Sequence, residues 1–189
     1  MPRLIDVESR RRELAEATWR LVERDGLDAV SVRAVAREAG VSPGSLRHVF
    51  ASQAALLTFA MAALGERVAE RLEALPPAAT PLEGTLAVLA QLLPLDPERR
   101  REAEVWLPFV VKARVDPELR PVGRRADETL RRLVQMALAP LSLRNAEAAV
   151  EEVYALLDGL TLHAVLSGRP DPETMRGVLR AHLERLAES

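Results

Sequence analysis

The sequence predicts an all-α fold of about nine helices, with an N-terminal three-helix helix-turn-helix domain followed by a larger helical domain. Three observations support this fold class. Apolar residues make up 48% of the chain but aromatic residues only 3%, so the core must be built from Leu, Val and Ala, a mixture that favours helix over sheet. These apolar residues recur three and four positions apart. Helix-start signals also recur along the chain, and no segment reads as a strand.

The first three predicted helices follow each other closely. Residues 8–25 form one apolar face, which Gly26 ends, and this face contains Leu14, Thr18, Leu21 and Val22. Ser31 caps the second helix, and Gly40 ends it after the apolar residues Val32, Val35, Ala36 and Ala39. Ser42 caps the third helix and Pro43 suits its first position. We expect the inward face of this third helix to contain Leu46, Val49 and Phe50.

Later helices are separated by equally clear signals. Ser52 caps a longer fourth helix, which the sequence "PPAATP" at residues 76–81 follows as the strongest break in the chain. Thr80 and Glu83 then have the capping-box spacing of a helix start. The triplet Asp-Pro-Glu, which also favours a helix start, begins at Asp96, Asp116 and Asp171. Pro108 lies inside a predicted helix and should kink it, because the carbonyl of Glu104 loses its hydrogen-bond partner.

Composition limits the function classes. The chain of 189 residues has no cysteine, which excludes disulfides, thiolate metal sites and a cysteine nucleophile. It has no run of about 18 apolar residues and no N-terminal signal pattern, so we expect a cytoplasmic protein that does not enter a membrane. The motifs of phosphate-binding loops, zinc hydrolases and serine hydrolases are all missing. We therefore expect no enzyme, no cofactor and no metal site.

The third helix carries an outer face that suits the major groove of DNA. Gly44 and Ser45 are small enough to let the start of this helix approach closely, and Arg47 and His48 can donate to bases or phosphates. The candidate DNA-binding residues are Ser31, Arg33, Ser42, Pro43, Gly44, Ser45, Arg47, His48, Ser52 and Gln53. The spacing alone leaves two interpretations open, because an Arg-His pair on a helix is usually a solvated face. The net charge of −2 does not decide between them.

The stretch "DAVSVRAVAREAGVSPGSLRHVFASQAALL", residues 28–57, resembles the DNA-binding domain of the TetR family of transcriptional regulators. The resemblance extends over about residues 8–57 and keeps many positions in register. Three residues depart from the family pattern. Arg47 stands where a tyrosine usually contacts phosphate, Val49 where His or Tyr is common, and Gln53 where a lysine usually binds the backbone. We interpret these departures as altered operator contacts.

The last two predicted helices indicate a second copy of the chain as partner. The helix over residues 146–167 is apolar on two faces and needs two partners, and the last helix repeats its apolar residues at helical spacing. Two such helices from each of two chains form a four-helix interface, and the alternative is that both pack only within one chain. The predicted interface residues are Leu156, Leu160, His163, Val178, Leu179, His182 and Leu186.

A ligand cavity is expected near the predicted kink. The segments "EVWLPFVVKARVDPELR" (residues 104–120) and "LLDGLTLHAVLSGR" (residues 156–169) are similar to the choline/betaine-responsive branch of the family. Trp106, Phe109 and Val110 flank Pro108 and are the candidate ligand-binding residues, although plain core packing explains them equally well. Choline is a poor fit, because six aromatic residues make an aromatic cage hard to assemble.

Taken together, the resemblance implies a homodimeric, ligand-responsive transcriptional regulator, and a repressor in particular. Residues 1–52 would bind a palindromic operator in double-stranded DNA, and residues 53–189 would bind an unknown small-molecule effector and form the dimer. The alternative is a helical dimer that binds a small molecule or a protein and whose DNA binding is weak or lost, which Val49 and Gln53 motivate.

Overall fold

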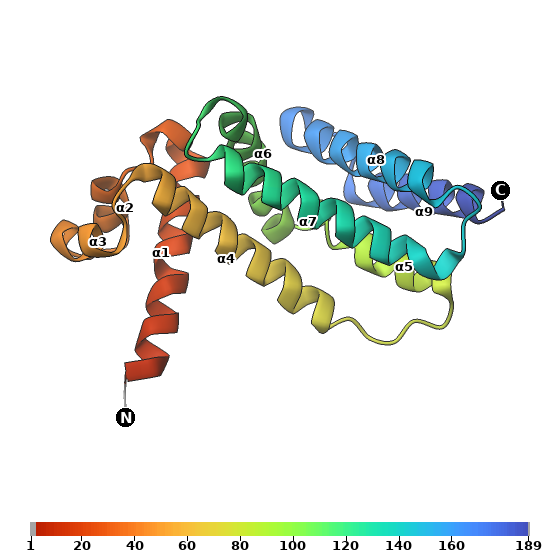
Figure 1. Ribbon diagram of the computed structural model, residues 1–189, viewed down its shortest axis with the longest axis horizontal. Helices are drawn as coiled ribbons and strands as arrows, with labels where there is room; N and C mark the ends of the chain where they lie inside the picture. Colours follow the sequence, from red (N-terminus) through yellow and green to blue (C-terminus); the bar gives the residue numbers. More distant parts are fainter. Residues whose placement is uncertain (1–2, 189) are drawn as a thin grey trace. The chain divides into compact units, whose positions relative to one another are not determined.

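The computed structural model describes residues 3–188, with side chains from residue 9 onward. Within this range the chain forms nine α-helices, two short 3-10 helices and no strand, which confirms the predicted fold class (Figure 1). The elements in chain order are α1 (Arg3–Asp25), η1 (Leu27–Ala29), α2 (Val32–Glu38), α3 (Pro43–Val49), α4 (Gln53–Glu73), α5 (Pro81–Ala90), α6 (Pro97–Val115), α7 (Arg120–Leu138), η2 (Ala139–Leu141), α8 (Ala146–Ser167) and α9 (Pro172–Glu188).

These helices form two compact units. The first, which we call the head, runs to Arg67 and also includes Glu104–Gly123. The second, which we call the bundle, contains Val68–Ala103 and the chain from Arg124 onward. The head is therefore larger than the predicted domain of residues 1–52, because the first part of α4 and a segment of α6 and α7 pack into it.

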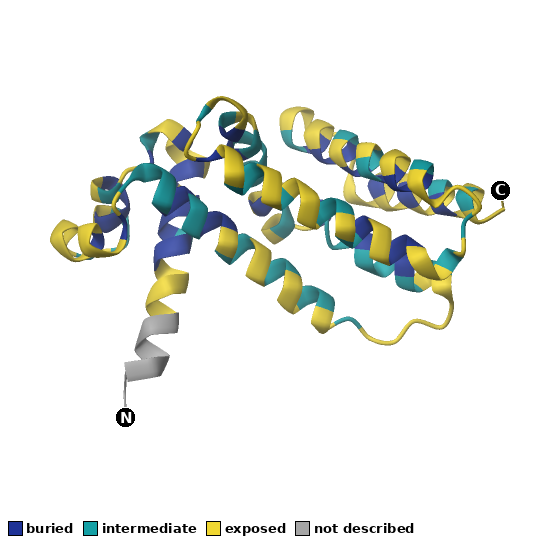
Figure 2. Cartoon of the chain, viewed as in Figure 1, coloured by how far each residue is buried: buried dark blue, intermediate teal, exposed yellow. Residues whose placement is uncertain are grey.

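The head has one apolar core. Figure 2 shows that the middle of α1 is buried there, and α1 contributes Leu14, Leu21 and Val22 to a core that also contains Val35, Leu46, Phe50, Leu56, Phe109 and Leu119. Trp19 joins α1 to α4, because its indole N–H donates to the carbonyl of Ala60 at 3.2 Å. The guanidinium of Arg67 lies 4.5 Å from the centre of the Trp19 ring and also pairs with Glu16. These contacts hold α4 against α1.

The bundle has a separate core. Its fully buried residues come from α5, α7, α8 and α9 and the segment after α5, and they include Leu89, Leu93, Val134, Val153, Leu179 and Leu183. Helices α8 and α9 lie side by side (Figure 1). A buried hydroxyl joins α5 to α7, because Thr85 donates to the carbonyl of Ala137 at 2.7 Å. Arg71 and Glu102 form a bidentate ion pair with nitrogen–oxygen distances of 2.7 and 2.6 Å.

The helix starts predicted at Thr80, Asp96 and Asp171 are confirmed, whereas the one predicted at Asp116 is not, because α7 begins only at Arg120. Thr80 and Glu83 form both bonds of the capping box of α5. Asp96 accepts a hydrogen bond from the backbone N–H of Arg99, and Asp171 accepts one from that of Thr174. No described helix taken singly is both long and apolar enough to span a membrane, and only the bent pair α3 and α4 together passes the test of length and composition.

Candidate nucleic-acid interface

Helices α2 and α3 form a helix-turn-helix. The turn between them is held by Gly40, whose φ of +65° lies in the left-handed region that glycine adopts without strain. The backbone N–H of Val41 donates to the carbonyl of Ala36 at 2.8 Å, and that of Gly40 donates to the carbonyl of Arg37 at 3.3 Å. Both bonds of a Schellman motif are therefore present, and they fix the direction in which the chain leaves α2.

The start of α3 is held by serine side chains. The hydroxyl oxygen of Ser42 accepts from the backbone N–H of Ser45 at 3.1 Å, and Pro43 occupies the first helical turn, as predicted. The hydroxyl groups of Ser42 and Ser45 are 2.8 Å apart and share one hydrogen bond. Pro43, Gly44 and Ser45 are all exposed. The start of α3 is thus preorganised and open to solvent.

The outer face of α3 is as the sequence predicted, but one inward residue was assigned wrongly. Leu46 and Phe50 are buried, and Arg47 and His48 are exposed. Val49 was expected to face inward and is 66% exposed. Helix α3 has only two turns and packs through the side that carries Leu46 and Phe50. Val49 lies about 60° around the helix from Leu46, on the side away from Phe50, so the head does not reach it.

Two of the predicted DNA-binding residues are helix caps, and a third lies close to one of these caps. Ser31 accepts from the backbone N–H of Ala34 at 3.1 Å and caps α2, and the neighbouring Arg33 is exposed. Ser52 accepts from the backbone N–H of Ala55 at 3.1 Å, and its hydroxyl donates to Glu118 at 3.4 Å. A capping serine keeps further hydrogen-bonding capacity, because its oxygen has two lone pairs and its proton is free to rotate.

Gln53 has a role within the head that the sequence did not indicate. Its amide nitrogen donates to the carbonyl of Val30 at 2.7 Å and to that of Leu27 at 3.3 Å. Both amide N–H groups are therefore committed to tying the start of α4 to the segment before α2. This accounts for a glutamine at this position without any contact to DNA.

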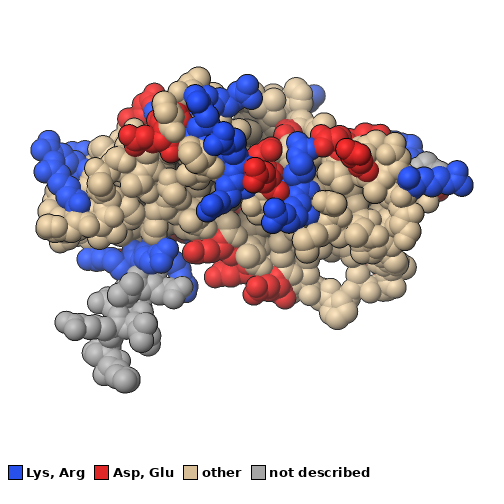
Figure 3. Space-filling view, in the orientation of Figure 1, with Lys and Arg blue, Asp and Glu red and all other residues tan. Residues whose placement is uncertain are grey.

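Positive charge dominates the exposed surface of α2 and α3. Arg33, Arg37 and Arg47 are exposed and form no ion pair with any side chain that the structure describes. Glu38 is the one acidic residue from Ser31 to Gln53, and it pairs with Arg20 and Arg24 of α1. Figure 3 shows basic side chains and no acidic ones over α2 and α3 at the left edge of the view. Arg37 was not among the predicted DNA-binding residues, although its position opposite the apolar side of α2 was a usable signal.

The predicted dimer residues lie on α8 and α9, but two of them, Leu160 and Leu179, belong to the bundle core. Leu156, Leu160 and His163 line a hollow of about 680 Å³, together with residues of the turn between the two helices. Val178 is 40% exposed, and His182 and Leu186 are partly buried. Leu179 has no exposed surface, because it fills the core of its own bundle. Leu179 therefore has no surface to offer a partner.

The predicted ligand residues belong to the head. Phe109 is completely buried in the head core, and Trp106 and Val110 are partly buried against that core. The rings of Trp106 and Phe109 are stacked, with their centres 6.4 Å apart. In the described part of the chain, no three His, Asp or Glu side chains are placed to hold a metal ion.

Comparison with known proteins gives the family of this chain. A family model of the bacterial regulatory proteins of the tetR family matches residues 14–58, which span the helix-turn-helix. A second model, of the C-terminal region of BetI-type transcriptional repressors, matches residues 81–188. The chain belongs to the TetR family. This TetR-family protein is accordingly a helix-turn-helix transcriptional regulator.

Its relatives match over almost their whole length. The transcriptional regulator PksA of Bacillus subtilis (strain 168) is 36% identical over 192 residues, which cover 98% of this chain and 94% of that protein. The regulator BetI of Escherichia coli (strain K12) is 30% identical over 189 residues, with 96% and 95% covered. The crystal structure of a transcriptional regulator from Rhodococcus sp. Rha1 has a TM-score of 0.84 at 31% identity, with 94% and 96% covered. The multidrug binding protein EbrR complexed with ethidium has a TM-score of 0.66 at 29% identity, with 92% and 98% covered.

Proposed function

We propose that this TetR-family regulator is a homodimeric, ligand-responsive repressor that binds a palindromic operator through α3. The observation that carries the proposal is the exposed surface of α2 and α3, where Arg33, Arg37 and Arg47 have no acidic partner among the described side chains. Unopposed arginines of this kind neutralise phosphates and fork onto guanine. Ser45, Arg47 and His48 would read bases, while Ser31, Arg33 and Ser52 would meet the backbone.

Apolar surface on α8 supports the homodimer. Leu162 and Leu166 are 41% and 74% exposed, and they lie on the side of α8 opposite the residues that fill its own core. Exposed leucines in a row on one helix mark an interaction surface, and α9 adds the exposed Val178. A twofold dimer presents two copies of α3, which is what two half-sites of a palindrome require.

The ligand part of the proposal rests on the relatives. The C-terminal match is to BetI-type repressors, and EbrR holds ethidium or imidazole in its crystal structures. We propose that a small organic effector binds the C-terminal region of this chain and favours a dimer geometry in which the two α3 helices no longer fit successive grooves. Such an effector acts by shifting the population of two states.

Selection of bound sequences from random duplex DNA tests the proposal. The unchanged protein should enrich a palindrome, and its affinity for that duplex should fall steeply with salt. Arg33 and Arg37 on each of two heads predict a slope of log affinity against log salt of about −4, and of about −5 where Arg47 also meets phosphate. A protein in which Arg33, Arg37 and Arg47 are all alanine should lose most of this slope. The matched control replaces Arg124, Arg125 and Arg132, which are equally exposed but lie in the bundle.

Two outcomes would contradict the proposal. No enrichment, or a response to salt that is flat, would leave the alternative of a helical dimer that binds a small molecule or a protein instead of DNA. If a compound from a metabolite panel binds tightly but leaves operator affinity unchanged, the repressor is not released by that class of ligand and the proposed induction mechanism fails.

A further inference from the structure

Glu38 stands where an acidic side chain is doubly unfavourable. It is the last residue of α2, where its charge meets the partial negative charge of the final carbonyl groups of the helix. It is also the one acidic residue from Ser31 to Gln53, the segment proposed to meet DNA phosphates. A carboxylate at this position repels both neighbours unless nearby cations compensate it.

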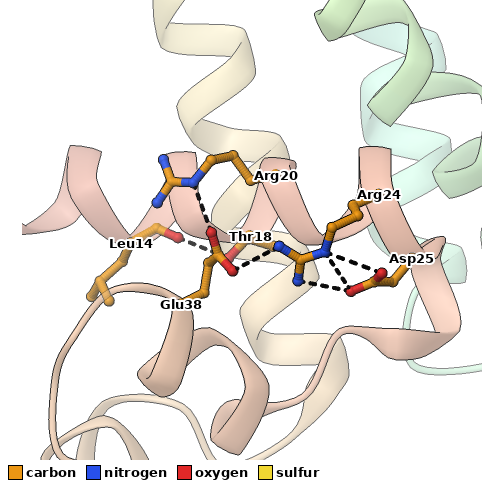
Figure 4. A network of polar contacts seen from close by, with 6 residues as sticks. All are labelled: Leu14, Thr18, Arg20, Arg24, Asp25 and Glu38. Carbon is orange, nitrogen blue, oxygen red and sulfur yellow. Dashed lines mark hydrogen bonds and ion pairs between the residues drawn. The ribbon is translucent and has the colours of Figure 1, made fainter.

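Two arginines of α1 hold this carboxylate (Figure 4). Arg20 Nε donates to Glu38 Oε1 at 3.0 Å, and Arg24 Nη1 donates to Glu38 Oε2 at 3.1 Å, so each carboxylate oxygen accepts one arginine. Arg24 is itself fixed from its other side by Asp25, with distances of 2.8 to 3.1 Å. The Glu38 side chain is only 20% exposed. Hydrogen bonds from Arg20 and then Arg24 hold the pKa of Glu38 below its usual range, so the carboxylate stays ionised at neutral pH.

The remaining contacts of α2 with the head are mainly apolar. Val35 and Ala36 are completely buried in the head core. The apolar face sets the rotation of α2 only coarsely, because apolar contacts are non-directional and tolerate small shifts. Charge-assisted hydrogen bonds are directional, and the bonds to Arg20 and Arg24 attach to the end of α2 from which the Gly40 turn leads into α3.

We infer that Glu38 is a positioning residue for DNA recognition, which fixes the orientation of α2 and α3 on α1 through Arg20 and Arg24. This inference rests on the proposed function. A positioning role for Glu38 differs from a purely stabilising role in its effect on two kinds of DNA. Loss of Glu38 misaligns α3 and weakens binding to the operator, while the head becomes more positive and its binding to random DNA does not weaken.

The test measures the affinities of Glu38→Gln for two duplexes, the one that the unchanged protein selects from random DNA and a scrambled duplex of equal length. Gln keeps the size of the side chain but offers one oxygen and no charge. Operator affinity should fall about tenfold for each head, the size of one charge-assisted hydrogen bond, and so about a hundredfold for the dimer. Affinity for the scrambled duplex should stay level or rise. The matched control is Glu13→Gln, which removes an acid from the same head, and the one ion pair that Glu13 forms with a described side chain is with Arg10 of the same helix. Its operator-to-scrambled ratio should stay within about twofold of the starting value.

A double-mutant cycle completes the test. Arg20→Met should lower the ratio less than Glu38→Gln does, because Arg24 still holds Glu38. The two changes combined should lower it no further than Glu38→Gln alone, because Arg20 acts through Glu38. The inference is overturned if Glu38→Gln leaves the ratio of operator to scrambled-duplex affinity unchanged, as Glu13→Gln should. It is also overturned if Glu38→Gln lowers the affinities for both duplexes together with the melting temperature. Failure of the unchanged protein to select any duplex refutes the proposed function instead, and the inference with it.

Discussion

Replacement of Arg47 by alanine separates the reading of DNA from the packing of the head. The Arg47 side chain is exposed and has no ion-pair partner among the described residues, whereas its neighbour Leu46 is 3% exposed in the head core. Exposed side chains without partners change stability by only about 0.5 kcal/mol or less when removed. Leu46→Ala, the contrasting change, should cost about 2–5 kcal/mol. Arg47→Ala should therefore melt with the unchanged protein and Leu46→Ala well below it.

The loss of binding depends on what Arg47 contacts. A bidentate contact to guanine is worth about 1–3 kcal/mol, so its loss from both heads of a dimer costs about 2–6 kcal/mol against the operator alone. A phosphate contact is instead lost on every sequence, and its loss makes the salt slope shallower by about 0.9 for each head. Fluorescence anisotropy with operator and scrambled duplexes at several salt concentrations distinguishes these two cases.

Two results would refute the reasoning. If Arg47→Ala lowers the melting temperature as Leu46→Ala does, the faces of α3 have been assigned wrongly. If the affinity and the salt slope both stay unchanged, Arg47 does not meet DNA, and the arginine at this position is only a solvated side chain.

Further predictions concern the bundle and the start of α4. Leu162→Asp should dissociate the dimer in sedimentation experiments without unfolding the chain, and a dimer that survives this change would remove this face of α8 from the interface. Leu179→Ala should instead lower the free energy of unfolding by about 2–5 kcal/mol. Gln53→Ala leaves the carbonyls of Leu27 and Val30 without their donor, so the melting temperature should fall, and an unchanged value would show that water replaces the amide. Partial desolvation of this surface carboxyl, with a smaller contribution from Asp127, raises the pKa of Asp158. The folded chain therefore binds this proton more tightly than the unfolded chain, and stability falls as the pH rises from the ordinary to the raised pKa. Asp158→Asn should raise the melting temperature at neutral pH and not at a pH below the ordinary carboxyl range. If the variant and the unchanged protein have the same melting temperature at both pH values, desolvation of Asp158 does not affect stability.

Much of the helix-turn-helix could be predicted because its determinants are local. Gly40 adopts the left-handed conformation, and Ser42 and Pro43 start α3 through contacts within a few residues of chain. Spacing also placed Leu46 inside and Arg47 outside. Spacing could not place Val49, because a helix of two turns is buried only where a neighbour reaches it, and the position of that neighbour is not encoded in the helix itself.

The same distinction holds across the chain. The all-α class, the helix starts at Thr80, Asp96 and Asp171, and the helix-turn-helix follow from local sequence, since caps, turns and periodicity depend on neighbouring residues. The packing of whole helices is needed to show that Phe109 packs in the head, that Leu179 fills a core and that Gln53 ties α4 to the segment before α2. It also decided that Glu38 meets two arginines of α1. Each of these contacts joins residues far apart in the chain, where the choice of partner depends on how whole helices pack and not on local pattern.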